Sequence, residues 1–265
     1  MLTESDRNRI QSKARAAIDN ATLRTDPWWA YPASVATFLT VALVYSTWAG
    51  LQTSGYYAEP YLSPLFSPCL AANCEHATFR LIGSWWTITP FLLVGWLPIL
   101  FRLTCYYYRK AYYRSMFFSP AACAVQEPSI ALGKYGETRG PFLLQNLHRY
   151  FFYLMIVNMV FLTWDTGKAF VFEDGFGVGV GSLVFLVMIV TMSLYMLSCH
   201  SCRHAVGGNL DLFSKAPIRH KAWKLVSRLN LNHGPFALVS LLWIPVTDIY
   251  VRLVANGTIT DYRFF

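Results

Sequence analysis

The side chains of this 265-residue chain best suited to metal or redox chemistry are its 6 cysteines and 6 histidines. Several of them stand at the ends of apolar segments: His148 in QNLHRYFFY, Cys199 and Cys202 in CHSCRH, and His233 in NLNHGPF. Two thiolates with two neutral imidazoles are typical of tetrahedral zinc and of a Rieske-type [2Fe–2S] cluster, in which two Cys hold one iron and two His hold the other. We therefore predict a metal centre with the ligands Cys199, Cys202, His148 and His233.

Helix geometry limits how CHSCRH can serve such a centre. At about 100° per residue, Cys199 and Cys202 lie roughly 60° apart on one face of a continuous helix. His200 and His204 lie on a face turned about 150° away, so one segment offers either its thiols or its imidazoles. The second case defines the alternative ligands Cys105, Cys123, His200 and His204. A third interpretation needs no metal, because cysteine is also a common small residue in packed helices.

The composition of the chain indicates that membrane-spanning helices position these side chains. Hydrophobic residues make up 55% of the chain and charged residues only 14%, against roughly 25% charged in soluble domains. The aromatic content of 17% suits rings at membrane interfaces. Five apolar windows approach the roughly 20 residues that a membrane-spanning helix needs, and they are residues 33–50, 81–101, 143–164, 178–198 and 235–253. The predicted fold class is an all-α membrane protein with five transmembrane helices in a bundle.

The distribution of charge orients these predicted spans. Of the 22 Lys and Arg residues, 18 fall in residues 1–33, 102–149 and 203–228, and only 4 fall on the other side. Because cytoplasmic loops carry the excess of positive charge, we expect a multi-pass plasma-membrane protein with its N-terminus in the cytoplasm and its C-terminus outside. The excess of Lys and Arg then reflects the membrane topology and contact with membrane lipid. We therefore predict no nucleic-acid partner.

The same pattern divides the chain into three parts. Residues 1–32 form a cytoplasmic N-terminal segment in which apolar residues recur at helical spacing, typical of an amphipathic helix or of a solvated helical tail. Residues 33–255 form the transmembrane domain, and residues 256–265 form an external tail. Cys69 and Cys74 lie in the first predicted external loop, where an oxidising environment favours a disulfide between them.

Several motifs of this sequence, within roughly residues 102–255, resemble the membrane anchor subunit of actinobacterial succinate dehydrogenase (respiratory complex II): CYYYRKAYYRS, SPAACAVQEP, QNLHRYFFY, CHSCRHAVGG and LNLNHGPFALVSL. The resemblance implies a subunit that does not itself oxidise succinate. It implies two partners, a flavoprotein subunit that oxidises succinate and an iron–sulfur subunit docked on the cytoplasmic face. It also implies a respiratory-chain and tricarboxylic acid cycle role, in which electrons pass to a membrane quinone, menaquinone or ubiquinone.

The chain departs from many anchors of this kind, which hold haem b between two histidines within the membrane. No histidine lies near the middle of a predicted span. Haem b ligated by His148 and His233 near the cytoplasmic face is the alternative cofactor, but it leaves the cytoplasmic cysteines without a role. We therefore expect the two-Cys, two-His [2Fe–2S] cluster. The other functions considered are a haem b anchor of another quinone-reactive enzyme, and a transporter or structural anchor without a redox centre.

Quinone binding requires hydrogen bonds to carbonyl oxygens beside an apolar groove. Polar side chains near the predicted centre are the candidates: Gln145, Asn146, Arg149, Arg203 and Trp223. For the two arginines, the alternative is that they only contribute to the positive charge of the cytoplasmic face. Farther along the chain, Asp248 and Arg252 stand four residues apart in the last predicted span, so we expect them to pair with each other.

Overall fold

The computed structural model describes residues 4–6, 26–70, 88–118 and 140–265. The chain forms two compact units, one made of residues 1–40 and 109–136 and the other of residues 41–108 and 137–265. The second unit, called here the large unit, contains every predicted ligand of the metal centre except Cys123, which lies outside the described residues.

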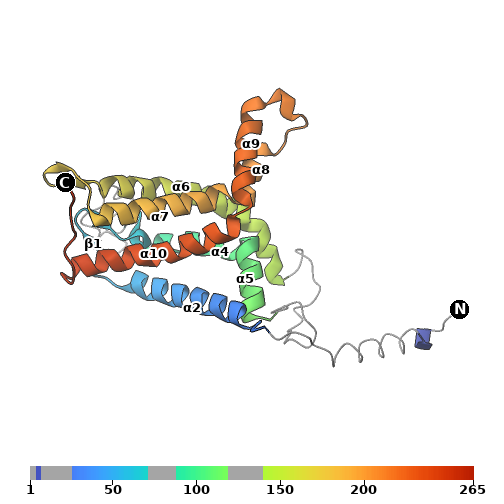
Figure 1. Ribbon diagram of the computed structural model, residues 1–265, viewed down its shortest axis with the longest axis horizontal. Coiled ribbons are helices and arrows are strands. Elements are labelled where there is room, and N and C mark those ends of the chain that lie inside the picture. Colours follow the sequence, from blue (N-terminus) through green and yellow to red (C-terminus); the bar gives the residue numbers. More distant parts are fainter. Residues whose placement is uncertain (1–3, 7–25, 71–87, 119–139) are drawn as a thin grey trace. The chain divides into compact units, whose positions relative to one another are not determined.

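Helices dominate the described chain (Figure 1). They are α2 (Ala30–Leu51), α3 (Phe91–Val94), α4 (Trp96–Leu103), α5 (Tyr106–Met116), α6 (His148–Lys168), α7 (Val180–Leu197), α8 (His200–Gly207), α9 (Pro217–Asn230) and α10 (His233–Ala255). Short 3-10 turns are η1 (Pro64–Phe66), η2 (Gly140–Leu147) and η3 (Phe213–Lys215). Two antiparallel hairpins pair β1 (Tyr57–Ala58) with β2 (Tyr61–Leu62) and β3 (Val171–Phe172) with β4 (Gly175–Phe176).

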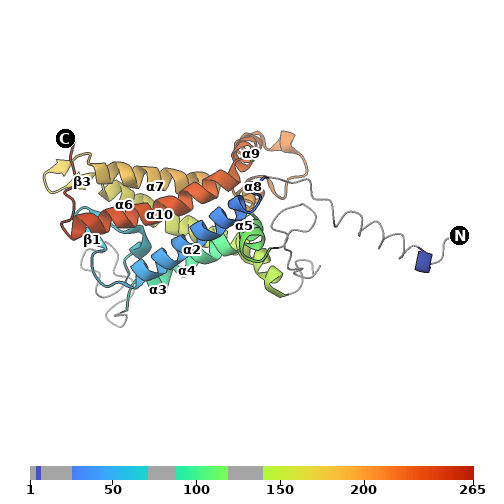
Figure 2. The same cartoon turned by 60° about the horizontal axis from the view of Figure 1, so that its bottom comes forward.

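The core of the large unit lies between α4, α6, α7 and α10, which run side by side in both views (Figures 1 and 2). One end of this helical core carries the β hairpins, and the other carries α8 and α9. Large side chains that are almost fully buried fill the core: Phe101, Met155, Phe185, Met188, Met192 and Tyr195. The opposite faces of α6 and α7 expose valines and leucines, which suits contact with hydrocarbon rather than water.

Three described helices, α2, α7 and α10, are long and apolar enough to cross a membrane. The bent pair formed by residues 91–103 and 106–116 raises the number to four. Residues 81–87, the start of the predicted second span, lie outside the described residues. Helix α6 has 21 residues, but Asn158 and Asp165 lower its hydropathy.

Those two polar side chains of α6 form hydrogen bonds with Ser67, the residue that follows η1. The Asn158 amide donates to the Ser67 carbonyl oxygen across 3.4 Å, and the Ser67 hydroxyl donates to the Asp165 carboxylate. Because a polar group buried without a hydrogen bond is costly, these contacts allow α6 to carry an amide and a carboxylate within an apolar helix.

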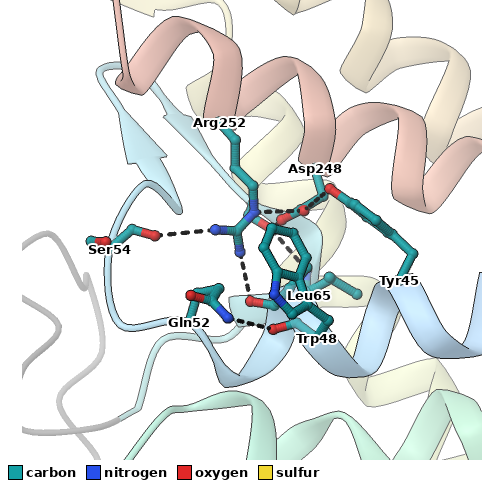
Figure 3. A network of polar contacts seen from close by, with 9 residues as sticks. Tyr45, Trp48, Gln52, Ser54, Leu65, Asp248 and Arg252 are labelled. Atoms are coloured by element: carbon teal, nitrogen blue, oxygen red, sulfur yellow. Dashed lines mark hydrogen bonds and ion pairs between the residues drawn. The ribbon is translucent and has the colours of Figure 1, made fainter.

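A second polar network joins α2 to the C-terminal half of α10 (Figure 3). Asp248 is fully buried and accepts hydrogen bonds from the Tyr45 hydroxyl at 2.6 Å and the Arg252 Nε at 2.8 Å. The Ser63 hydroxyl also donates to it. The Arg252 guanidinium reaches on to the carbonyl oxygen of Ala49 at 2.6 Å. The predicted i, i+4 ion pair between Asp248 and Arg252 is confirmed.

The C-terminal residues are tied to the large unit. Gly179 and Arg263 form an isolated antiparallel bridge, and Arg263 makes an ion pair of 2.5 Å with Asp174. The Arg263 guanidinium holds the pKa of the exposed Asp174 carboxyl below its usual value. The tail that follows α10 is therefore folded back onto the loop before α7.

Candidate metal centre

Two imidazoles lie at the starts of two helices, as predicted. His148 is the first residue of α6 and His233 the first residue of α10. His148 is buried, and His233 is partly exposed. Both helices begin at the same end of the core (Figure 1).

Each imidazole lies between a hydroxyl and a thiol. The Nε2 of His148 is 3.0 Å from the Cys199 Sγ, and its Nδ1 is 2.9 Å from the Thr104 Oγ1. For His233, the Nε2 is 3.4 Å from the Cys105 Sγ. Its Nδ1 is 2.8 Å from the hydroxyl of Ser198, the residue before Cys199. The structure thus brings together two thiols and two imidazoles, with Cys105 in a place that the sequence assigned to Cys202.

The hydroxyl groups determine which ring nitrogen carries the proton. Thr104 donates its hydroxyl proton to the Leu100 carbonyl oxygen at 2.7 Å, and Ser198 donates to the Tyr195 carbonyl oxygen at 2.9 Å. Each hydroxyl oxygen is then left as an acceptor, which favours the tautomer with the proton on the imidazole Nδ1. The Nε2 lone pair of each ring consequently faces a thiol. A hydrogen bond from the second ring nitrogen is the usual way in which proteins orient a metal-binding histidine.

Two matching pentapeptides supply the thiols and hydroxyls. Residues 101–105 read FRLTC and residues 195–199 read YMLSC, so each contains an aromatic residue, Leu, a hydroxyl and Cys. The aromatic ring of each pentapeptide stacks on one histidine: Phe101 on His148 at 4.8 Å, and Tyr195 on His233 at 5.2 Å between ring centroids. This repeat was a signal in the sequence that could have identified Cys105.

A break in the helix explains why Cys202 is not beside the histidines. Helix α7 ends at Leu197, and Cys199 has an extended backbone with ψ of 144° as the residue before α8. The assumption of one continuous helix through CHSCRH is therefore wrong. Cys199 is 1% exposed and Cys202 is also buried, but in the described chain only Cys199 of these two contacts a histidine. Burial raises the pKa of the Cys199 thiol to about 12.

The alternative imidazoles lie on α8, where neither makes a hydrogen bond to a described thiol. His200 and His204 are both exposed on α8. The Nδ1 of His204 lies 3.1 Å from the Arg149 Nη2, so it contacts the start of α6 but no thiol. Within the described ranges, no three His, Cys, Asp or Glu side chains converge to hold a single metal ion. The geometry is that of two adjacent thiol–imidazole pairs, which does not match one tetrahedral zinc ion.

The five candidate quinone ligands lie in two places around α8. Gln145 is buried and Asn146 exposed in η2, directly before α6, and the exposed Arg149 follows in its first turn. Between α8 and α9, the guanidinium of Arg203 lies 5.0 Å above the ring of Trp223, a residue of α9. The contact between Arg149 and His204 links the first group to α8.

Cys69 is disulfide-bonded. Its predicted partner, Cys74, lies outside the described residues. The pairing of Cys69 with Cys74 therefore stays a prediction, and the cysteines of the candidate centre, Cys105 and Cys199, are free thiols.

Known proteins match this chain over nearly its whole length. Residues 30–257 match the family of the actinobacterial succinate dehydrogenase subunit SdhC. A chain in the solved structure of the Mycobacterium smegmatis Sdh1 complex in the apo form is 43% identical, with a TM-score of 0.83. That match covers 92% of this chain and 94% of the other. No individually curated protein matches.

Proposed function

This chain belongs to the actinobacterial SdhC family of succinate dehydrogenase subunits, and we propose that it relays electrons from the soluble part of that complex to a membrane quinone. As an SdhC subunit it is a membrane anchor that is not itself catalytic for succinate oxidation. The observation that carries the proposal is the pair of thiol–imidazole contacts, His148 with Cys199 and His233 with Cys105.

We infer that these four side chains hold a Rieske-type [2Fe–2S] cluster. The donor set of two thiols and two imidazoles suits such a cluster, which exchanges one electron at a time when it is bound. In the tautomer whose Nδ1–H donates to the hydroxyl of Thr104 or Ser198, both Nε2 lone pairs face the thiols. Cys105 takes the place of Cys202 in the predicted ligand set. Haem b fits less well, because a thiol occupies the position directly beside each Nε2.

Ligation requires the thiols to lose their protons. The raised pKa of Cys199 keeps this thiol protonated at neutral pH in the metal-free chain. Cys199 would give up this proton when it holds a metal ion, because the thiolate is the form that coordinates. The neutral imidazoles add no charge, which limits the cost of burying the centre at a membrane edge.

The proposed topology has five membrane-spanning helices in a bundle, with the N-terminus in the cytoplasm and the C-terminus outside the plasma membrane. The three apolar helices and the bent pair support four of these spans, and α6, which packs against α4 and α7, is the fifth. Residues 1–32 remain a proposed amphipathic segment and residues 256–265 a proposed external tail. The excess of Lys and Arg in the segments assigned to the cytoplasm supports this orientation.

The proposed docking surface for the iron–sulfur subunit, and through it the flavoprotein subunit, includes α9. This helix exposes Lys221, Lys224 and Arg228, and such a basic surface favours association with an acidic partner. The proposed quinone site is formed by three residues at or just before the start of α6, one of α8 and one of α9: Gln145, Asn146, Arg149, Arg203 and Trp223. Its support is the proximity of Arg149 to His148 in sequence and to α8 in space.

The test uses the purified whole complex. We expect broad visible absorption, matching amounts of iron and acid-labile sulfide, and a cluster signal by electron paramagnetic resonance that disappears in the double variant His148→Ala, His233→Ala. That variant should lose quinone reduction but keep succinate oxidation by an artificial soluble dye. Full quinone reduction in the double variant, or a sharp Soret band in the wild type, would contradict the proposed cluster.

A further inference from the structure

Arg102 is a buried positive charge in α4. Its side chain would be expected at the cytoplasmic surface from sequence, yet the residue is only 8% exposed. Its Nη1 donates to the Tyr108 hydroxyl at 2.5 Å and to the Ala237 carbonyl oxygen at 3.3 Å. Both Nη1 and Nη2 lie 3.2 Å from the Ser240 Oγ. These partners satisfy its hydrogen bonds but do not neutralise its charge.

No described carboxylate lies within ion-pair distance of Arg102, since the ion pairs in the described ranges join other residues. A guanidinium this buried normally has an anionic partner, because burial of an uncompensated charge is costly. By contrast, Arg252 of the same unit, whose side chain is 11% exposed, pairs with Asp248. The unpaired charge of Arg102 therefore calls for a different explanation.

Arg102 lies close to the candidate metal centre. The Arg102 Cζ lies 4.8 Å from the centroid of the Tyr195 ring, and that ring lies 5.2 Å from the His233 ring. The guanidinium carbon is thus within about 10 Å of the His233 imidazole. Arg102 also belongs to the pentapeptide that ends in Cys105, whereas Met196 holds the equivalent position before Cys199. The two halves of the centre are therefore alike in ligands but unlike in charge.

We propose that Arg102 raises the reduction potential of the metal centre by stabilising its reduced state with an uncompensated positive charge. The inference rests on the proposed function. One electron enters the oxidised centre from the docked iron–sulfur subunit and later leaves towards quinone, and no bond of Arg102 forms or breaks. Each reduction adds one negative charge, so a fixed positive charge nearby favours the reduced state.

The size of the effect follows from distance. With an effective dielectric constant of about 20, a unit charge at about 10 Å changes a one-electron equilibrium roughly tenfold to twentyfold. A tenfold change corresponds to about 59 mV for a one-electron couple. Loss of the Arg102 charge should therefore lower the midpoint potential by at least about this amount.

The experiment is a redox titration of the cluster signal in the whole complex. Arg102→Gln should lower the equilibrium constant for reduction of the centre about tenfold. Arg102→Lys keeps the charge, so its midpoint potential should stay near that of the wild type. Lys168→Gln removes a charge from the exposed last turn of α6, at the opposite end of that helix from His148, and serves as the matched control, with no shift of the potential expected. A role of Arg102 only in holding α4 to α10 would destabilise the complex without moving the potential.

A second variant neutralises the charge of Arg102 without removing the arginine. Ser240→Asp places a carboxylate at the position from which the Ser240 Oγ contacts both guanidinium nitrogens, and should lower the potential as Arg102→Gln does. Unchanged potentials in Arg102→Gln and Ser240→Asp, or equal shifts in Arg102→Gln and Arg102→Lys, would overturn the inference while the cluster itself stands. Absence of any cluster signal in the wild type would instead overturn the proposed function.

Discussion

The network around Asp248 makes a quantitative prediction about stability. Asp248 is fully buried, and the Arg252 side chain is only 11% exposed. Replacing Arg252 by Met removes the only cation paired with this carboxylate in the described chain, and leaves the Tyr45 and Ser63 hydroxyls as its donors. Breaking one side of a buried ion pair costs about 3–5 kcal/mol. For a chain of this size, 1 kcal/mol lowers the melting temperature by about 2–4 °C, so Arg252→Met should lower it by at least about 6 °C.

The assay is thermal unfolding of the purified complex in lipid nanodiscs, followed by tryptophan fluorescence. Trp48 is a local reporter, because the Arg252 Cζ lies 5.9 Å from its ring centroid (Figure 3). The double variant Asp248→Asn, Arg252→Met removes both charges and should recover much of the loss. Arg263→Met breaks the exposed ion pair with Asp174 and is the matched control, with a much smaller effect because solvent screens that pair.

Two results would refute this reasoning. One is a melting temperature for Arg252→Met that is no lower than that of Arg263→Met. The other is a double variant that is less stable than Arg252→Met alone, since that would mean the buried charge of Asp248 is not the source of the cost.

Three further predictions concern the centre and its surface. Cys105→Ser should release iron and sulfide from the complex, whereas Cys202→Ser should retain them, and the opposite result would restore the ligand set expected from sequence. Thr104→Val and Ser198→Ala should each weaken metal retention about 10- to 100-fold in a chelator competition, because each removes the partner of an imidazole Nδ1–H; wild-type retention would show that neither hydroxyl orients its ring. Protease cleavage of the segment containing Cys123 should slow when the soluble subunits are added, and unchanged cleavage would count against docking at that segment.

The positions of the apolar helices could be predicted from sequence alone. Helices α2, α7 and α10 begin and end within a few residues of the windows 33–50, 178–198 and 235–253. This works because hydropathy over about 20 residues is a local property of the chain. The pairing of Asp248 with Arg252 was predictable for the same reason, since four residues along a helix bring two side chains to one face.

The placement of His148 and His233 at helix starts also followed from sequence, but the thiols beside them did not. Spacing favoured Cys199 with Cys202 on one helix, and the backbone instead leaves the helical path at Cys199. Cys105 lies 128 residues from the imidazole that it contacts. Such a contact depends on how α4 and α10 pack, which no local pattern specifies.

The environment of Arg102 was likewise decided only by the tertiary structure. As sequence, it is one of the Lys and Arg residues that mark the cytoplasmic side. In the fold, side chains of α7 and α10 surround it: Met192, Tyr195 and Ser240. Charge counting predicts the side of the membrane on which a residue lies, because each charge contributes to an average over a loop. Whether that charge meets water or the interior depends on which helices surround it.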